Sequence, residues 1–505
     1  MTTPAPPRSG RTSARELIDH VLDPGTWLSW DAPPTRPAAV EPGYAAELRA
    51  AAERSGADEA VRTGEGRIHG RRVAVVACEF AFLAGSIGVA AADRLVAAIE
   101  RATAERLPLV ASPTSGGTRM QEGVVAFLQM VRITAAVSAH RAAGLAYLVY
   151  LRGPTTGGVL ASWGSLGHVT AAEPGALIGF LGPRVYEALH GEPFPTGVQT
   201  AENLYAHGLV DAVVPPRELR RVASRVLGVV TAPRAAVADV PALPKEALSD
   251  VPAWDSVVRS RRGDRPGVRA LLRLAAADVV PLHGTGEGES DPGLLLALAR
   301  FGAAPCVLLG QDRRHQSKHG PFGPAGLRVA RRGMRLAAEL GLPLVSVIDT
   351  AGAALSPEAE EGGLAGEIAR CLADLVALPA PTLCLLLGQG AGGGALALLP
   401  ADRVLCAQHA WLAPLPPEGA SVIRYRTTGR AAELAAAQGV RSLDLLRDGV
   451  VDRIVAERPD AADEPAEFIT RLGQALESEL AELLRRPAAE RRAARLGRYA
   501  RLGNS

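Results

Sequence analysis

The sequence predicts an α/β protein made of two tandem domains of the same design. Segments of the first half recur about 235 positions later in the second half. Short apolar runs, typical of buried strands, alternate with longer segments that have one apolar face, which is the pattern of strand–helix units. With 505 residues, the chain is long enough for two domains that each bury a core of their own.

In the first half, residues 1–10 are rich in Pro, Ser and Thr and are predicted to be disordered, and a short helix is expected over 13–22. In the helix expected over 89–106, Leu95, Val96 and Ile99 share one face, with charged residues between them. The full order predicted is a strand over 72–78, a helix over 89–106, a strand over 107–111, a helix over 121–141, a strand over 146–151 and a helix that starts at a Gly-Gly turn at 157–158.

The second half repeats this order. It predicts a strand over 306–309, a helix over 327–339, a strand over 344–348, a helix over 361–378, a strand over 382–387 and a glycine turn at 392–394. Between the halves, residues 230–252 are rich in Pro and Ala and predict a linker. The two domains are therefore placed at 1–240 and 241–505.

Composition limits the function classes. Hydrophobic residues make up 48% of the chain, charged residues 21%, and the net charge is +2. Such a charge argues against nucleic acid as a partner, because phosphate-driven binding needs a basic surface. The five cysteines form no CxxC pair and the N-terminus has no secretion-signal pattern, so a cytoplasmic protein with reduced thiols is expected. The longest apolar stretch, 382–400, is interrupted by Gln389 and by glycines, so no membrane span is expected.

Each half carries two small-residue turns at matched positions. The sequence SGGT at 115–118 corresponds to TAGA at 350–353, and the glycine pair at 157–158 corresponds to the pair at 393–394. Two glycines at the start of a helix present free backbone N–H groups with no side chain to block a ligand. A main-chain oxyanion hole is built in this way. The alternative is that these glycines only let a helix pack closely on a strand.

Other chemistries have weaker support. The stretch 388–393 matches the GxGxxG pattern of dinucleotide-binding proteins, but the strand after it ends at His409 and offers no acid for a ribose. The sequence has no GxSxG motif, so a serine hydrolase is not expected. His315 and His319 are four residues apart, and an exposed loop is favoured over a metal site for them because no third ligand lies nearby.

Few charged residues are candidates for catalysis. Glu122 is either a base or a favourable charge at the start of its helix, and Asp349 is expected to order its turn rather than to abstract a proton. Seven arginines between residues 485 and 501 predict a solvated helix face, with a docking surface as the alternative.

At these turns the chain resembles the carboxyltransferase component of biotin-dependent acyl-CoA carboxylases, in the crotonase superfamily. The first half is similar to the β subunit of bacterial acetyl-CoA carboxylase carboxyltransferase through residues 115–122, 153–159, 172–180 and 182–184, and the second half to the α subunit through 253–257, 349–353, 392–397 and 417–421. The resemblance covers most of the chain in the order β then α, as in a natural fusion. It implies two tandem crotonase-like (ClpP/crotonase) domains of β-β-α superhelical repeats, with the acyl-CoA side in 1–240 and the biotin side in 241–505.

The resemblance also implies a mechanism. Carboxybiotin on a separate carrier protein releases CO₂ and takes a proton from the α-carbon of an acyl-CoA, and the enolate captures the CO₂. Acetyl-CoA is the default acceptor. By resemblance, Gly157 and Gly158 hold the thioester oxygen, and Gly394 with Ala395 the ureido oxygen of biotin. The residues implied to line the substrate pockets are Ser115, Gly116, Gly117, Thr118, Gly352, Ala353 and Gly393. The implied partners are biotin carboxylase, biotin carboxyl carrier protein and a second copy in a homodimer.

The chain departs from the family pattern in several places. Residues 1–70 contain no cysteine, so the four-cysteine zinc ribbon of the bacterial β subunit is missing and no metal is predicted. The positions that differ near the expected pockets are Thr118, Ala351, Ala354, Leu355 and Gln389. The main alternative is a malonyl-thioester decarboxylase on the same scaffold. A non-catalytic scaffold and a nucleotide-dependent oxidoreductase are further alternatives.

Overall fold

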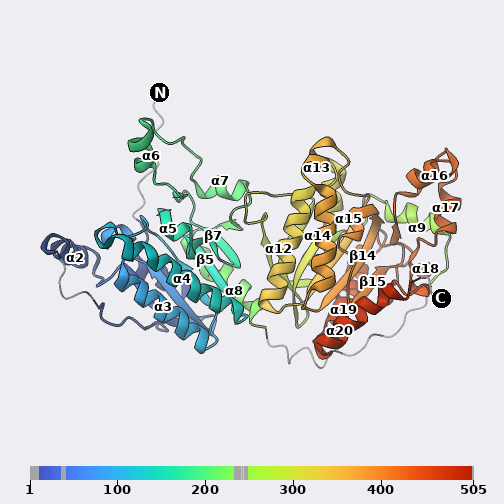
Figure 1. The fold of residues 1–505 in the computed structure, drawn as a ribbon. Coiled ribbons are helices and arrows are strands. Elements are labelled where there is room, and N and C mark those ends of the chain that lie inside the picture. Colours follow the sequence, from blue (N-terminus) through green and yellow to red (C-terminus); the bar gives the residue numbers. More distant parts are fainter. Residues whose placement is uncertain (1–10, 36–40, 233–239, 241–242, 244–247, 503–505) are drawn as a thin grey trace. The chain divides into compact units, whose positions relative to one another are not determined.

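The computed structural model describes residues 11–35, 41–232, 240, 243 and 248–502. The predicted disordered segment 1–10 and much of the predicted linker lie outside these ranges. Contacts between residues divide the chain into two compact units, Met1–Leu227 and Gly228–Ser505, here called unit 1 and unit 2 (Figure 1).

Unit 1 is built on a seven-stranded sheet with the order β1-β2-β3-β4-β5-β7-β9. β2 pairs with β3 antiparallel, and from β3 to β9 all neighbours are parallel. The strands are β1 (Leu28–Ser29), β2 (Val61–Ile68), β3 (Arg71–Cys78), β4 (Leu109–Ser112), β5 (Tyr147–Leu151), β7 (Val169–Ala172) and β9 (Ala212–Val213). A separate parallel pair joins β6 (Thr155–Thr156) to β8 (Ile178–Gly179).

The helices of unit 1 are α1 (Ala14–Val21), α2 (Pro42–Ser55), α3 (Val89–Ala104), α4 (Gly123–Ala142), α5 (Gly157–Leu160), α6 (Pro183–His190), α7 (Ala201–Ala206) and α8 (Leu219–Val230). The apolar face predicted for α3 lies in the core, where Leu95 and Ile99 are buried with residues of the parallel strands. Burying Leu- or Ile-sized side chains contributes about 1.5–3 kcal/mol each. This packing holds the strand ends, where the predicted turns lie.

Unit 2 repeats the design. Its sheet has the order β10-β11-β12-β13-β14-β15-β17, antiparallel up to β12 and parallel beyond, with β16 paired to the end of β14. The strands are β10 (Ala276–Leu282), β11 (Leu294–Phe301), β12 (Ala304–Gln311), β13 (Leu344–Thr350), β14 (Thr382–Ala391), β15 (Arg403–Ala407), β16 (Trp411–Ala413) and β17 (Arg453–Val455).

The first helices of unit 2 are α9 (Ala253–Ser260), α10 (Val268–Leu274), α11 (Arg313–His319), α12 (Pro324–Leu340), α13 (Pro357–Glu361), α14 (Leu364–Ala377) and α15 (Gly392–Leu396). They are followed by α16 (Pro417–Tyr425), α17 (Ala431–Ala437), α18 (Ser442–Arg447), α19 (Pro465–Arg485) and α20 (Ala488–Ala500). The loop predicted around His315 and His319 is wrong, because both lie on α11 with their rings stacked at 4.5 Å.

The arginine-rich tail is only partly a solvated face. Arg495 on α20 is almost fully buried and binds Asp402 through two hydrogen bonds of 2.9 and 3.0 Å. The same guanidinium also donates to three backbone carbonyls. One is that of Leu375 in the last turn of α14, and the others are those of Leu378 and Ala380 just after it. A buried charge needs such partners. Arg495 therefore attaches α20 to the body of unit 2, and spacing along the sequence could not show this.

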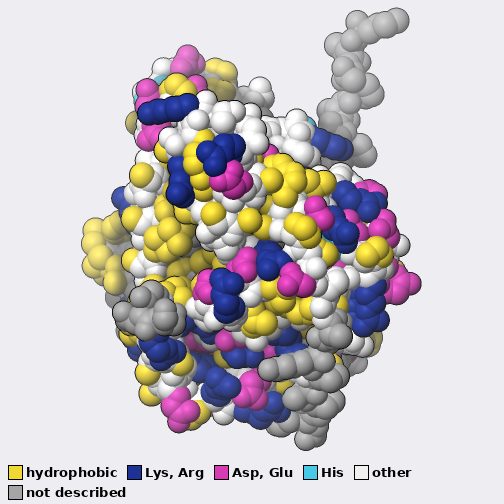
Figure 2. Space-filling model, turned by 90° about the vertical axis from the view of Figure 1, so that its right-hand side faces the viewer, with side chains coloured by type: hydrophobic (Ala, Val, Ile, Leu, Met, Phe, Trp, Pro, Cys, Tyr) yellow, Lys and Arg dark blue, Asp and Glu magenta, His cyan; other side chains and the backbone are white. Residues whose placement is uncertain are grey.

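The face of the molecule shown in Figure 2 carries basic and acidic side chains interspersed with hydrophobic ones. Arg430 and Glu433 form one ion pair of unit 2 at 2.5 Å, and Arg261 binds Glu418 at 2.5 and 3.0 Å. Exposed pairs of this kind contribute little to stability. Because each positive charge lies next to a negative one, these parts of the surface have little net charge.

Helix α4 has an unusual exposed surface. Five of its large apolar side chains are more than half exposed, those of Val124, Val125, Phe127, Leu128 and Val131. By length and composition, one helical segment of the described chain, Met120–Ala142, could cross a membrane, although a single such segment is weak evidence because core helices of soluble proteins pass the same test. A contiguous apolar surface of this kind is typical of an interaction site.

Candidate active site

The first turn of unit 1 lies between β4 and α4 and is held by Ser115. This side chain is fully buried, and its Oγ accepts a hydrogen bond of 3.0 Å from the N–H of Gly117. Gly117 has φ of +107°, a conformation that side chains disfavour. Gly116 donates its N–H to the carbonyl of Ala84 at 2.9 Å. Among the described residues, the N–H of Thr118 has no acceptor, so this turn offers one free donor.

The second piece of this site is the start of α5 (Figure 1), which contacts β6 and β8. Gly157 has φ of +62° and donates its N–H to the carbonyl of Phe180 at 2.8 Å. The next N–H, that of Gly158, lies in the first turn of the helix, where no intrahelical acceptor exists, and it has no other acceptor in the described chain. A Cβ on Gly158 would lie 3.4 Å from Oγ1 of Thr118. The two free donors are therefore neighbours.

Unit 2 builds the same turn at the end of β13. Oγ1 of Thr350 accepts the N–H of Gly352 at 3.1 Å, and Gly352 has φ of +139°. The N–H of Ala354 donates to the carbonyl of Phe322 at 3.0 Å. Between them, the N–H of Ala353 has no acceptor among the described residues. Ala353 thus corresponds in position and in hydrogen bonding to Thr118.

Helix α15 supplies the second piece in unit 2. Its N-cap is Ala391, so the N–H groups of Gly393 and Gly394 lie in the first turn and lack intrahelical acceptors. Gly394 is buried, and a Cβ there would lie 3.0 Å from the backbone N of Ala353. A side chain at this position would therefore crowd the N–H of Ala353. Ala395 is fully buried one turn into the helix, where its N–H is the first that the helix itself can bond.

Backbone conformation corrects the register of the repeat in this region. Gly157 and Gly392 both open a short helix, with φ of +62° and +65°. The offset is therefore 235 here as it is at the first turn, and Gly158 corresponds to Gly393 rather than to Gly394. The sequence pairing was one residue too late because three consecutive glycines at 392–394 leave the match ambiguous.

The structure also shows which residues of the predicted site have a free backbone N–H group and which do not. Gly157 and Gly116 shape their turns, but their N–H groups are already used. Thr118 and Ala353, expected only as pocket lining, carry free N–H groups. Sequence reasoning missed this because the long-range acceptors at Ala84 and Phe180 decide which N–H groups stay free.

Buried charges stabilise the first turn of unit 1. Arg119, directly after Thr118, is almost fully buried and pairs with Glu59 at 2.5 Å. The carboxylate of Glu122 accepts hydrogen bonds from the N–H of Val89 at 2.6 Å and from the hydroxyl of Tyr44 at 2.5 Å. Burial and the Glu122 carboxylate raise the pKa of Tyr44 to about 12. Glu122 thus caps α3 and is not available as a base, and its charge acts on α3 rather than on its own helix.

Asp349 has an ordering role at the second turn. It is buried, and its Oδ1 accepts the N–H of Gln389 at 3.1 Å, which ties the end of β13 to β14. Burial raises the pKa of Asp349, although the Arg313 guanidinium 3.6 Å away opposes this. The expectation that Asp349 orders its turn agrees with this contact.

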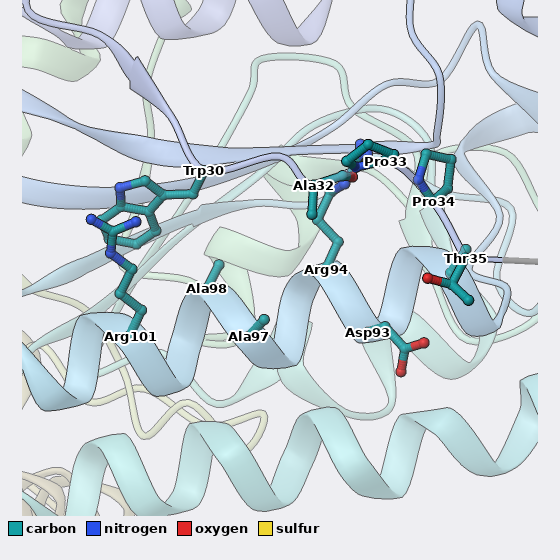
Figure 3. Close-up of a pocket in the computed structure, with 11 residues that line it drawn as sticks. Trp30, Ala32, Pro33, Pro34, Thr35, Asp93, Arg94, Ala97, Ala98 and Arg101 are labelled. Atoms are coloured by element: carbon teal, nitrogen blue, oxygen red, sulfur yellow. Dashed lines mark hydrogen bonds between the residues drawn. The ribbon is translucent and has the colours of Figure 1, made fainter.

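The GxGxxG match is explained by packing. Gly388 and Gly390 lie inside β14, and a Cβ on them would come within 2.3 Å of Oδ1 of Asp349 and 2.7 Å of the carbonyl of Trp411. These glycines allow neighbouring strands to approach and form no open phosphate loop. A groove of about 250 Å³ along α3 is lined by Trp30, Ala97, Arg94 and Arg101 among others (Figure 3). Its lining includes no residue of 115–118 or 157–158, and Arg94 is bound to Asp58. In the described ranges, His, Cys, Asp and Glu form no group of three or more that could hold a metal ion.

Comparison with known proteins places the whole chain. The model of the carboxyl transferase domain matches residues 7–494. The chain belongs to the carboxyl transferase family. It is 64% identical over 502 residues to a protein of Mycobacterium tuberculosis named probable biotin-dependent acyl-coenzyme A carboxylase beta3 subunit, covering 98% of this chain and 99% of the relative. It is 36% identical to the acetyl-coenzyme A carboxylase carboxyl transferase subunits beta/alpha of Salinispora arenicola, covering 98% and 91%.

Solved carboxyltransferases share the fold. A transcarboxylase 12S crystal structure, described as a hexamer with methylmalonyl-coenzyme A and methylmalonic acid bound, matches with a TM-score of 0.70 at 20% identity over 92% of this chain and 89% of that chain. The predicted α/β fold of two crotonase-like domains and the predicted family are confirmed, and the protein is a carboxyl transferase enzyme. Biotin dependence and acyl-CoA, predicted from the resemblance, both appear in the name of the Mycobacterium tuberculosis relative.

Proposed function

We propose that this chain is the carboxyltransferase component of a biotin-dependent acyl-CoA carboxylase, which moves a carboxyl group from carboxybiotin on a carrier protein to the α-carbon of an acyl-CoA. One observation carries the proposal. Each unit joins a turn and a helix start whose free backbone N–H groups are neighbours, so each can stabilise one oxyanion. The names of the relatives support the carboxyl donor and the class of acceptor.

In unit 1, the N–H groups of Thr118 and Gly158 would bind the thioester oxygen of the acyl-CoA. Negative charge grows on this oxygen as the α-proton leaves, so fixed donors stabilise the enolate more than the ground state. Gly117 leaves room for the substrate, since a Cβ there would point toward the N of Gly158, 3.8 Å away. Losing one such donor typically costs about 3–4 kcal/mol in the transition state.

In unit 2, the N–H groups of Ala353, Gly393 and Gly394 would hold the ureido oxygen of biotin. The cradle fits such a group, because glycine at 394 keeps the space in front of the Ala353 N–H open. Carboxybiotin supplies the carboxyl group and, once that has left, a ureido nitrogen that accepts the α-proton. No carboxylate beside the turns then has to act as a base, in agreement with the structural roles of Glu122 and Asp349.

The acyl group of the acceptor is the finer part of the proposal. Acetyl-CoA is the default acceptor. No feature of the described site favours the decarboxylase alternative, and the relatives carry carboxylase names.

A carboxyl-transfer assay tests the proposal. The protein is incubated with biotin carboxylase, biotinylated carrier, ATP, labelled bicarbonate and a panel of acyl-CoAs. We expect label in at least one carboxylated acyl-CoA, dependent on the carrier. Absence of label across the panel would refute the proposal, and carrier-independent release of CO₂ from malonyl thioesters would favour the decarboxylase.

We also propose that the chain works as a cytoplasmic homodimer with biotin carboxylase and biotin carboxyl carrier protein as separate partners. The exposed apolar side chains of α4 support self-association, because such a surface is costly to leave in water. The buried free thiols are compatible with a reducing compartment. Mass photometry of the purified chain should give twice the monomer mass, and Phe127→Glu should lower it to the monomer. A larger assembly, like the hexamer described for transcarboxylase 12S, would correct the dimer.

A further inference from the structure

A single buried glutamine joins the two pieces of the unit 2 site. Gln311 is the last residue of β12 and is fully buried. Its Oε1 accepts the N–H of Asp349 at 3.1 Å, and its Nε2 donates to the carbonyl of Gly394 at 2.7 Å. One side chain therefore links the strand end that leads into the second turn to the start of α15.

The bond to Gly394 supplies a hydrogen bond that α15 does not make for itself. The carbonyl of Gly393 accepts the N–H of Ala397 at 2.9 Å, and the carbonyl of Ala395 accepts that of Leu398 at 3.1 Å. The Gly394 carbonyl between them receives its hydrogen bond from Gln311. A helix of five residues has few internal bonds to hold its shape, so this outside bond fixes the orientation of its peptide groups.

Unit 1 reaches the same geometry without such a residue. The residue that matches Gln311 in unit 1 is Cys78, the last residue of β3, because Ala74 pairs with Leu109 as Val307 pairs with Leu344. A thiol has one polar atom and cannot bridge two backbone groups as an amide side chain does. In unit 1 the carbonyl of Val159, which corresponds to that of Gly394, accepts from the hydroxyl of Ser162 at 3.4 Å, and the same hydroxyl donates to the carbonyl of Gly158 at 2.5 Å. The glutamine bridge is thus specific to unit 2.

We propose that Gln311 is a positioning residue for the biotin side of the reaction. Gln311 fixes the start of α15 relative to the end of β13, the strand that leads to Ala353. The N–H groups of Gly394 and Ala353 therefore keep pointing at the same oxygen. This inference rests on the proposed function, in which unit 2 holds the ureido oxygen. Loss of the bridge weakens the reaction with carboxylated carrier and leaves the binding of acyl-CoA unchanged.

The test compares three variants of the full chain with the biotin carboxylase and carrier present. Gln311→Leu removes both bonds, and Gln311→Glu keeps the shape and the acceptor but loses the donor. The matched control is Gln408→Leu, because Gln408 is also buried in unit 2 and also uses both ends of its amide. Its Nε2 donates to the hydroxyl and the carbonyl of Ser249 at 2.7 and 3.1 Å, and its Oε1 accepts the N–H of Glu457 at 3.0 Å.

For both Gln311 variants, we expect kcat/KM for the carboxylated carrier to fall about 10–100-fold, the usual effect of losing an outer support of a site, with KM for acyl-CoA within about two-fold of wild type. Gln408→Leu should change neither constant. An unchanged carrier constant in both Gln311 variants, or an equal fall in the control, overturns the inference.

Hydrogen exchange provides a readout that does not need activity. Amides over residues 392–398 should exchange faster in Gln311→Leu than in wild type or in Gln408→Leu, and unchanged exchange there contradicts the positioning role. Faster exchange in a protein whose wild type transfers no carboxyl group to any acyl-CoA would instead refute the proposed function and leave the structural role of Gln311 standing.

Discussion

A valine at position 158 should block the unit 1 site while leaving the fold intact. Gly158 has an ordinary φ, and a Cβ there would lie 3.3 Å from Cγ of Met130 and 3.4 Å from Oγ1 of Thr118. These contacts are tight, but both are to side-chain atoms rather than to backbone, and side chains can shift. The extra methyl groups of Gly158→Val would fill the space in front of the free N–H groups of residues 118 and 158.

Two magnitudes follow from this geometry. Overpacking of a close site costs about 1–3 kcal/mol of stability, which a domain with about 5–15 kcal/mol tolerates. Loss of oxyanion stabilisation costs about 3–4 kcal/mol in the transition state, which is 100- to 1,000-fold in rate. The variant should therefore unfold only a few degrees below wild type and yet lose at least 100-fold in carboxyl transfer to acyl-CoA.

The assay follows labelled carboxyl transfer with carrier and acyl-CoA varied separately, beside thermal unfolding. Gly267→Val is the control, because Gly267 is likewise at the N-terminal end of a helix, has an extended backbone and has no atom within 4 Å of its Cβ position. It should keep both activity and stability. A Gly158→Val enzyme that is folded and turns over within a few-fold of wild type would refute the assignment of this N–H.

Three further predictions test separate parts of the structure. Because Gly157 has φ of +62°, Gly157→Ala should be about 1–2 kcal/mol less stable than Gly158→Ala, and equal unfolding midpoints would contradict this. Arg495→Met leaves the buried Asp402 with only the more distant Arg491, 4.0 Å away, as an ion-pair partner. It should cost about 3–5 kcal/mol, seen as faster hydrogen exchange over 488–500; unchanged protection there would show that α20 is held by other contacts. Burial lowers the pKa of His140 from 6.5 to about 4. Below pH 6.5 the unfolded chain therefore binds a proton at His140 that the folded chain does not, so the free energy of unfolding falls as the pH drops from 6.5 toward 4. Denaturant titrations should show that His140→Gln flattens this slope, and an unchanged slope would assign it to other groups.

The parallel core was predictable from the sequence, and the sheet edges were not. β3, α3, β13 and β14 have apolar runs or a single apolar face, and the structure places each within a few residues of the expected range. Strand β2 has charged residues and glycines at 64 and 66, where Trp27 and Leu22 pack closely against the backbone. Its antiparallel pairing depends on these distant contacts, so local pattern gave no sign of it.

The same division holds for the site. The sequence indicated where the small-residue turns lie, because matched glycines recur across the two halves. It could not indicate which N–H groups are free, because those of Gly116 and Gly157 are bound by carbonyls at Ala84 and Phe180. Nor could it reveal the role of Gln311, which links residues that lie 38 and 83 positions away.

The most direct test of the account is a structure of the protein with an acyl-CoA bound. The account predicts that the thioester oxygen lies about 2.7–3.1 Å from the backbone N atoms of Thr118 and Gly158. A bound acyl-CoA whose thioester oxygen contacts neither N atom would contradict it.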